Sequence, residues 1–276
     1  MALTVNTNIT AMSATKNLSR SNSGLSASLG RISSGMRINS AADDAAGLGV
    51  AENLSAASRS VRVAQRNTND GISLVQTAEG STSEVGNILK RMRELAVQSA
   101  SETLDDGERA YIQDEFVAMS SEVDRIANVT EFNGVALTDG TNATIGVQVG
   151  INNTADDSID ITLGDLSAAT LGVDTGTMSL ATSAGAGTAL AAIDTALDTV
   201  NGYRSDYGAA QNRLESSLRN LENYDQSLTS AESQIRDTDF AKESAEMAKY
   251  QVMQQAGVAA LGQAKSINMQ AAQLIQ

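Results

Sequence analysis

The second half of the chain carries an apolar residue at every seventh position without a break. These residues are Ile193, Val200, Tyr207, Leu214, Leu221, Leu228 and Ile235. A period of seven sustained over this length is that of a coiled coil, in which one seam of a helix stays against a partner helix. The other seam position is mixed, and includes the polar residues Arg204, Gln211 and Asp225. Each seam residue stabilises by about 1.5–3 kcal/mol when fully buried, so we expect a partner helix to cover the stripe.

The first half also has helical periodicity. Leu18, Leu25 and Ile32 are seven apart, and Leu29 lies between them. A second helix is predicted over 45–99 and a third over 108–128, because apolar residues recur there at steps of three, four and seven. The chain has no Pro, so the strongest helix breaker is absent and long helices are permitted.

The middle of the chain changes period. Apolar residues alternate with polar residues or Gly on both sides of a polar stretch at 152–158, which predicts a β-hairpin region over 140–165. Residues 166–189 are rich in Gly, Ala, Ser and Thr, and predict a short connector that forms a loop or a small exposed subdomain.

These elements predict a mainly α fold, a long antiparallel helical hairpin or coiled-coil bundle with a small β-hairpin region. The terminal helices are interrupted by Gly24, Gly30, Gly35, Gly257 and Gly262. Each Gly inside a helix costs about 1 kcal/mol relative to Ala, and an isolated helix is marginal in water without that cost. We therefore expect the terminal helices to order on assembly with a partner.

Charge and composition exclude several functions. The net charge is -14, so no nucleic acid partner is expected. The chain has no His and no Cys, which excludes Ser-His-Asp and Cys-His catalysis and zinc sites built on those ligands. Asp43 with Asp44, and Asp156 and Asp157 with Asp160, lack the order of a calcium loop and are interpreted as solvated turn carboxylates. We expect no catalytic, cofactor-binding or metal-binding residue, and no enzyme.

Two other functions stay open at this point. Residues 1–42 hold Lys16, Arg20, Arg31 and Arg37 and no acid, and a basic amphipathic helix can lie on an anionic membrane. The alternative is therefore a membrane-active helical toxin or translocator, and a carboxylate-based hydrolase is a third. Membrane insertion is not expected, because the apolar run Val258-Ala-Ala-Leu261 is far too short to span a bilayer.

Several segments resemble the bacterial flagellins. They are 2–8 (ALTVNTN), 31–48 (RISSGMRINSAADDAAGL), 66–71 (RNTNDG), 93–99 (RELAVQS), 131–134 (EFNG), 235–241 (IRDTDFA) and 254–257 (QQAG). The resemblance covers about residues 1–165 and 190–276. The chain departs from larger flagellins in having only a short connector in place of their outer domains, so it looks like a short form.

The resemblance implies a structural subunit that polymerises into the extracellular flagellar filament for swimming motility. Residues 1–44 with 236–276 would form the inner filament core, and 45–235 a helical shell domain. The implied partners are copies of the same chain, a flagellar export chaperone, the filament cap, hook-associated proteins and a flagellin-sensing Toll-like receptor of hosts. Export would proceed through the flagellar type III channel as an unfolded chain.

Candidate functional residues form two groups. The expected assembly and packing residues are Leu18, Leu25, Leu29, Ile32, Leu214, Leu221, Leu228, Ile235, Val252 and Leu274. The resemblance implies a receptor contact at Arg91 and Leu95, with Glu115 facing them. Ordinary packing within the shell and contact between subunits are the alternative roles of that second group.

Overall fold

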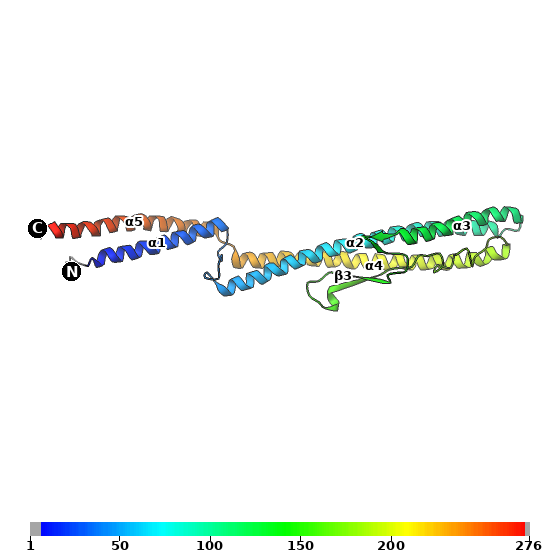
Figure 1. The fold of residues 1–276 in the computed structure, drawn as a ribbon, viewed down its shortest axis with the longest axis horizontal. Helices are drawn as coiled ribbons and strands as arrows, with labels where there is room; N and C mark the ends of the chain where they lie inside the picture. The colour runs from blue at the N-terminus through cyan, green and yellow to red at the C-terminus, as the bar shows by residue number, and fades with distance from the viewer. Residues whose placement is uncertain (1–6, 274–276) are drawn as a thin grey trace. The chain divides into compact units, whose positions relative to one another are not determined.

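The computed structural model describes residues 7–273, with side chains described as far as Ser266. Its helices are α1 (Ile9–Ser34), α2 (Ala45–Ser99), α3 (Asp106–Val129), α4 (Ser183–Arg236) and α5 (Phe240–Gln273). Its strands are β1 (Glu131–Phe132), β2 (Val135–Ala136), β3 (Thr144–Gln148) and β4 (Ser158–Thr162), and a 3-10 turn spans Ala155–Asp157. Helices α1 and α5 run side by side in opposite directions, as do α2 and α4 (Figure 1). The mainly α prediction is confirmed, and so is the predicted range of α2.

The heptad stripe of α4 is the seam that packs within the chain. Six of its seven residues, from Ile193 to Leu228, are buried, and Ile235 is half-buried. On α2 the buried positions also repeat every seven residues. One series contains Val61, Thr68, Val75, Thr82, Leu89 and Ala96. The expected partner helix is therefore α2 of the same chain.

The main hydrophobic cluster lies where α3 joins α2 and α4. Leu89 and Met92 of α2, Phe116 of α3 and Ile193 of α4 are all fully buried in it. The connector contributes to the same cluster through Leu166, Ala168, Leu171, Val173 and Leu180, each at most 5% exposed. The expectation of an exposed subdomain in the connector was therefore wrong. Its backbone is a loop up to the start of α4 at Ser183, but its apolar side chains complete the core.

A second cluster places the β-hairpin on the helices. Strands β3 and β4 pair antiparallel with Val147 opposite Ile159, and both side chains are buried. Val147 packs on Gly71 of α2, where a Cβ would lie 3.0 Å from both Val147 methyl groups. The predicted hairpin is confirmed. A shorter hairpin, β1 with β2, turns at Asn133 (φ 51°) and Gly134 (φ 78°), the left-handed backbone that an Asn-Gly turn supplies.

The chain divides into two compact units. One contains residues 1–58 with 227–276, and the other contains 59–226. The predicted division at 44/45 and 235/236 concerns layers of a filament, and stays a prediction. Both hydrophobic clusters lie in the second unit. Over the described part of the chain, no helix is both long and apolar enough to cross a membrane.

The first unit contains a clamp where the chain leaves α1 and where it enters α5. The Arg37 N–H donates to the Arg236 carbonyl oxygen at 2.6 Å, and the Thr238 N–H donates to that of Gly35 at 3.0 Å. Met36 and Asp237 form an isolated antiparallel bridge between these bonds. Gly35 (φ 72°) caps α1 in the left-handed conformation, which the absence of a Cβ permits.

Candidate functional site

The seam between α1 and α5 is built from small and polar residues. On α5 the inward positions repeat every seven residues as Glu243, Tyr250, Gly257 and Ala264, each buried or half-buried. On α1 the buried positions are Ser21 and Ser28. A Cβ on Gly24 would overlap the Tyr250 ring at 2.5 Å, and one on Gly257 would touch Leu18. The helices approach closely, but they bury little apolar surface.

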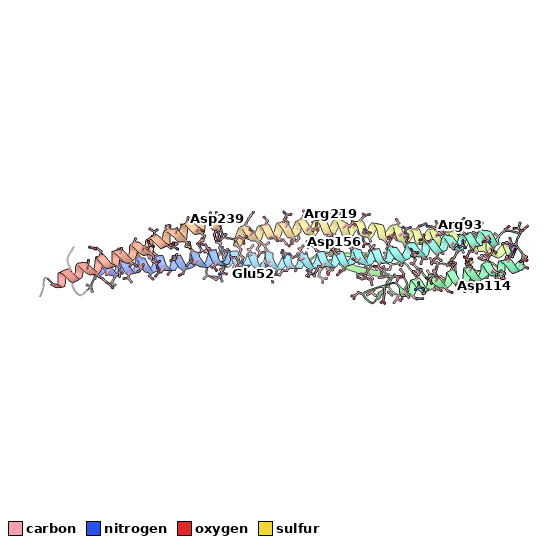
Figure 2. The ribbon with its side chains drawn as sticks, turned by 90° about the horizontal axis from the view of Figure 1, so that it is seen from above. Glu52, Arg93, Asp114, Asp156, Arg219 and Asp239 are labelled. Atoms are coloured by element: carbon pink, nitrogen blue, oxygen red, sulfur yellow. The ribbon has the colours of Figure 1, made fainter. Side chains whose placement is uncertain are left out.

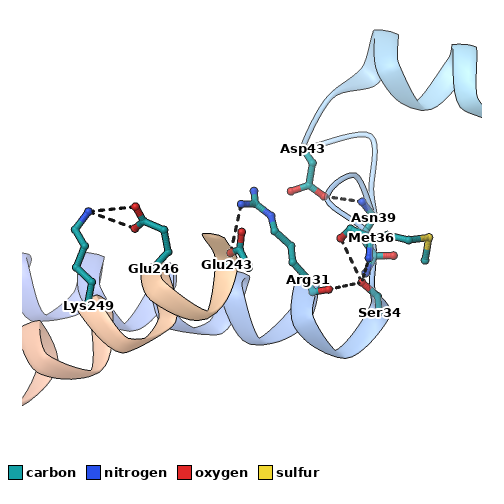
Figure 3. Close-up of polar contacts among 8 residues, drawn as sticks. All are labelled: Arg31, Ser34, Met36, Asn39, Asp43, Glu243, Glu246 and Lys249. Carbon is teal, nitrogen blue, oxygen red and sulfur yellow. Dashed lines mark hydrogen bonds and ion pairs between the residues drawn. The ribbon is translucent and has the colours of Figure 1, made fainter. Parts of the chain in front are cut away.

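Ion pairs and turn carboxylates surround one end of this seam (Figure 3). Glu243 is 8% exposed, and Arg31 of α1 faces it with 3.8 Å between Nη1 and Oε1. Lys249 and Glu246 of α5 pair with each other beside the same seam. After α1, Asp43 accepts hydrogen bonds from the backbone and hydroxyl of Ser40 and from the Asn39 N–H. The backbone bond from Ser40 is the main reason that the pKa of Asp43 lies below its usual value.

A second apolar surface of α5 faces solvent. It consists of Ala241, Ala245, Ala248, Val252, Ala256 and Ala259, all exposed, and is called here the outer stripe. These residues recur at steps of three and four. At about 100° per residue, they lie on the opposite side of the helix from the Tyr250–Gly257 seam. Val252, within the stripe, is 65% exposed. Helix α5 therefore packs on α1 through a face of small and polar residues, and carries an exposed apolar stripe on the opposite face.

The predicted packing residues separate into three groups. Leu214, Leu221 and Leu228 are buried and Ile235 is half-buried, all within the seam of α4. Three residues of α1 are half-buried beside α5: Leu18, Leu25 and Ile32. Leu29 is 48% exposed and Val252 65% exposed, so their side chains remain available to another molecule. Leu274 lies outside the described residues.

The predicted receptor residues form an ion-paired cluster on the surface of α2 and α3. Arg91 donates to Glu115 through Nη2 at 2.8 Å and through Nε at 3.2 Å, and to Glu94 through Nη1 at 3.0 Å. The Glu115 bond is the largest of the effects that raise the pKa of Arg91. Leu95 is only 2% exposed and belongs to the core. Its side chain therefore packs inside the bundle and is not part of the exposed surface.

Arg93, two residues after Arg91 on α2, pairs with Asp194 of α4 at 2.7 Å, and is labelled in Figure 2. The hydrogen bond from Arg93 holds the pKa of Asp194 below its usual value. Both groups are about half exposed, and exposed pairs of this kind contribute little to stability.

The carboxylates considered as metal ligands bind their own turns. Asp44 accepts from the Gly47 N–H at the start of α2, and Asp157 accepts from the backbone and hydroxyl of Thr154. Over the described residues, no group of three His, Cys, Asp or Glu side chains is placed to hold a metal ion. These carboxylates therefore act as acceptors within their own turns.

Sequence reasoning missed two features of this site. The small-residue seam of α1 was not recognised, because Ser21 and Ser28 are polar and an apolar template passes over them. The second face of α5 was seen only in part, through Val252. A count of Ala at helical steps from Ala241 onward would have found the whole outer stripe.

Comparison with known proteins covers nearly the whole chain. Residues 5–143 match the bacterial flagellin N-terminal helical region, and residues 190–275 match the bacterial flagellin C-terminal helical region. The flagellin of Halalkalibacterium halodurans is 42% identical over 272 residues, which is 99% of each chain. The flagellin of Bacillus subtilis is 37% identical over 304 aligned positions, again covering 99% of each. The crystal structure of Bacillus cereus flagellin superposes with a TM-score of 0.50 at 33% identity, and covers 56% of this chain and 88% of that one.

Proposed function

The chain belongs to the bacterial flagellin family, and from this premise we propose that the outer stripe of α5 is a contact through which subunits pack in the filament. The protein is the filament-forming subunit of the bacterial flagellum, a structural protein of the extracellular filament that serves motility, and not an enzyme. Its function therefore depends on self-polymerisation, and on surfaces that meet further copies.

The main support for this contact is that the outer stripe is apolar and exposed, while the opposite face of α5 already packs on α1 of the same chain. Burying Val252 alone would stabilise by up to about 1.5–3 kcal/mol. The Ala residues on either side let a second helix approach closely along the stripe. Because identical subunits repeat along a filament, the gain repeats at every subunit.

We further propose that the terminal helices become ordered on assembly. Among the residues whose side chains are described, the apolar residues buried in the first unit are few: Ile38, Ala51, Leu228 and Ala264. The second unit contains two clusters with large side chains. Helices α1 and α5 bury little apolar surface against each other, so their packing contributes little stability. Helices that lack packing are only marginally stable in water. Neighbouring subunits would supply the missing burial.

A single charge on the outer stripe tests the contact. Val252→Asp places a carboxylate in water in the free subunit, because the side chain is 65% exposed there, but buries it in the filament. An unpaired buried charge costs several kcal/mol, so elongation from filament seeds should fail while the melting temperature of the subunit is unchanged. Gln251→Asp adds the same charge at the next residue, off the stripe, and should polymerise. If Val252→Asp elongates normally, as measured by sedimentation, the outer stripe is not a contact between subunits in the filament.

We also propose the more specific partners that the resemblance implies. Before assembly the apolar residues of the outer stripe would be exposed to water. A flagellar export chaperone that binds the α5 segment would shield them while the chain is exported unfolded. The filament cap and hook-associated proteins would then meet the subunits at the filament ends. Chaperone binding can be measured by calorimetry with the full chain and with Val252→Asp. Equal affinity would show that the chaperone does not use the stripe.

A flagellin-sensing Toll-like receptor would recognise the Arg91–Glu115 surface. The support is the exposed, doubly paired guanidinium of Arg91, which offers a rigid polar contact on an ordered helix. Arg91→Ala should reduce signalling in receptor-expressing cells, and Arg125→Ala, which removes another paired Arg from α3, should not. Leu95→Ala is unsuitable as a test, because Leu95 is buried and its loss would loosen the core. Unchanged signalling by Arg91→Ala would exclude Arg91 as a contact.

A further inference from the structure

One face of α2 near the start of the second unit is basic, in a chain whose net charge is -14. Arg59, Arg62, Val63 and Arg66 are exposed and lie on one side of the helix, because they are three or four residues apart. We call them the arginine face. Arg62 is paired with Asp225 at 3.2 Å. Among the described residues, Arg59 and Arg66 have no ion-pair partner, and Val63 is 45% exposed between them.

The opposite charge gathers at the other end of the same unit, around the α2–α3 connection. We call this the acidic tip, and it consists of Glu102, Asp105, Asp106, Glu108, Tyr111 and Asp114, all exposed. Arg109, the cation within the tip, is 6% exposed and donates to the Ser99 and Ser101 carbonyl oxygens, so it is withdrawn from the surface. Figure 2 places Asp114 near that end of the bundle.

Tyr111 gives the tip an apolar centre. Its side chain is 78% exposed. An aromatic ring surrounded by carboxylates is a suitable surface for arginine, because the guanidinium stacks on the ring and donates to the carboxylates. Val63 supplies a matching apolar patch on the arginine face.

The two surfaces cannot meet within one molecule. They are joined by the single helix α2, and from Arg66 to Ser99 that helix rises about 50 Å at 1.5 Å per residue. A contact between different patches on identical subunits is heterologous, and it generates an open filament when it does not close into a ring.

We propose that the arginine face of one subunit docks on the acidic tip of a second copy. This proposal rests on the proposed function, and it adds an electrostatic contact of the second unit to the apolar contact of α5. The other acidic segment, the β-hairpin, is a weaker candidate because it already lies beside the arginine face in the same subunit, where Asn67 donates to the Gln148 carbonyl oxygen at 3.4 Å.

Charge reversal on each surface, and then on both, tests the docking. The face variant is Arg59→Glu with Arg66→Glu, and the tip variant is Glu102→Lys with Asp106→Lys. Each should raise the critical concentration for seeded elongation by about tenfold or more, because several attractions become repulsions. The chain that carries all four substitutions should recover most of that loss, and the parent should polymerise less readily as salt screens the contact.

Two comparisons keep the result interpretable. Arg213→Glu with Arg219→Glu makes the same change in net charge at exposed positions of α4, and should elongate like the parent. Circular-dichroism melting verifies that every variant is folded. Parent-like elongation of the face variant, no recovery in the fourfold variant, or an equal defect in the Arg213/Arg219 control would each overturn the docking. In all three cases the parent would still form filaments, so the proposed function would be unaffected.

Discussion

Gly24→Ala tests the close approach of α1 to α5. The added Cβ raises the helix propensity of α1, but it also overlaps a side chain of α5. In a helix that lacks tertiary contacts, Ala stabilises by about 1 kcal/mol relative to Gly. Against α5, the added Cβ would lie 2.5 Å from Cε1 and Cζ of Tyr250, far inside the optimal carbon separation of about 3.5–4.0 Å.

The overlap should outweigh the gain in helix propensity. Overpacking a close-packed seam costs about 1–3 kcal/mol, and the half-buried Tyr250 ring must shift to relieve the overlap. The net effect is a loss of up to about 2 kcal/mol per subunit. Since about 1.4 kcal/mol is a factor of ten, the critical concentration for elongation should rise by several-fold to more than tenfold.

Gly30→Ala is the matched control on the same helix. Its added Cβ meets nothing within 4 Å, so it carries the propensity gain without the overlap, and elongation should be as good as the parent's or better. In the Tyr250→Ala background, Gly24→Ala should also stop being harmful, because the ring is absent. If Gly24→Ala improves elongation as much as Gly30→Ala does, α1 and α5 are not packed as described.

Three further results are expected. Leu221→Asp should lower the melting temperature of the free subunit by circular dichroism, because it buries a carboxylate in the α4 seam; an unchanged melting temperature would contradict the intrachain seam. Brief proteolysis of the free subunit should trim both ends and leave about 45–235, whereas protection of the full chain would contradict order on assembly. Burial raises the pKa of Tyr207, so its contribution is fully present below the unfolded pKa and is lost as pH rises through the folded pKa. The thermal unfolding midpoint should therefore fall as the pH rises above about 10, and it should fall less steeply with pH in Tyr207→Phe. Equal slopes in the parent and the variant would show that Tyr207 is not the group responsible.

Much of the fold could be predicted because its main signal is periodic. The spacing of seven from Ile193 to Ile235 predicted a long helix with a covered stripe, and the seam of α4 confirms it. The alternation around residues 152–158 likewise predicted the pairing of β3 with β4. In both cases the burial pattern follows from the geometry of one element, so local spacing is enough.

The features that were missed depend on neighbours distant in sequence. Leu166, Leu171 and Leu180 have no common period, and they are buried because α2, α3 and α4 leave a place for the connector. Leu95 could be placed on a helix near Arg91, but its burial depends on which side faces α3 and α4. Ser21 and Ser28 are buried because α5 presents small residues to them, and that match cannot be inferred from α1 alone.

The clamp beside Gly35 and Asp237 has a mechanical consequence. A rotating filament transmits torque, and each subunit must pass part of that load between its terminal helices and the remainder of the chain. The load crosses two antiparallel backbone segments, joined by the Arg37-to-Arg236 and Thr238-to-Gly35 hydrogen bonds and by the Arg37 guanidinium on the Ile235 carbonyl oxygen at 2.7 Å. Because these bonds tie the two segments together, we expect them to resist shear as one connection, with neither stretching or twisting independently of the other.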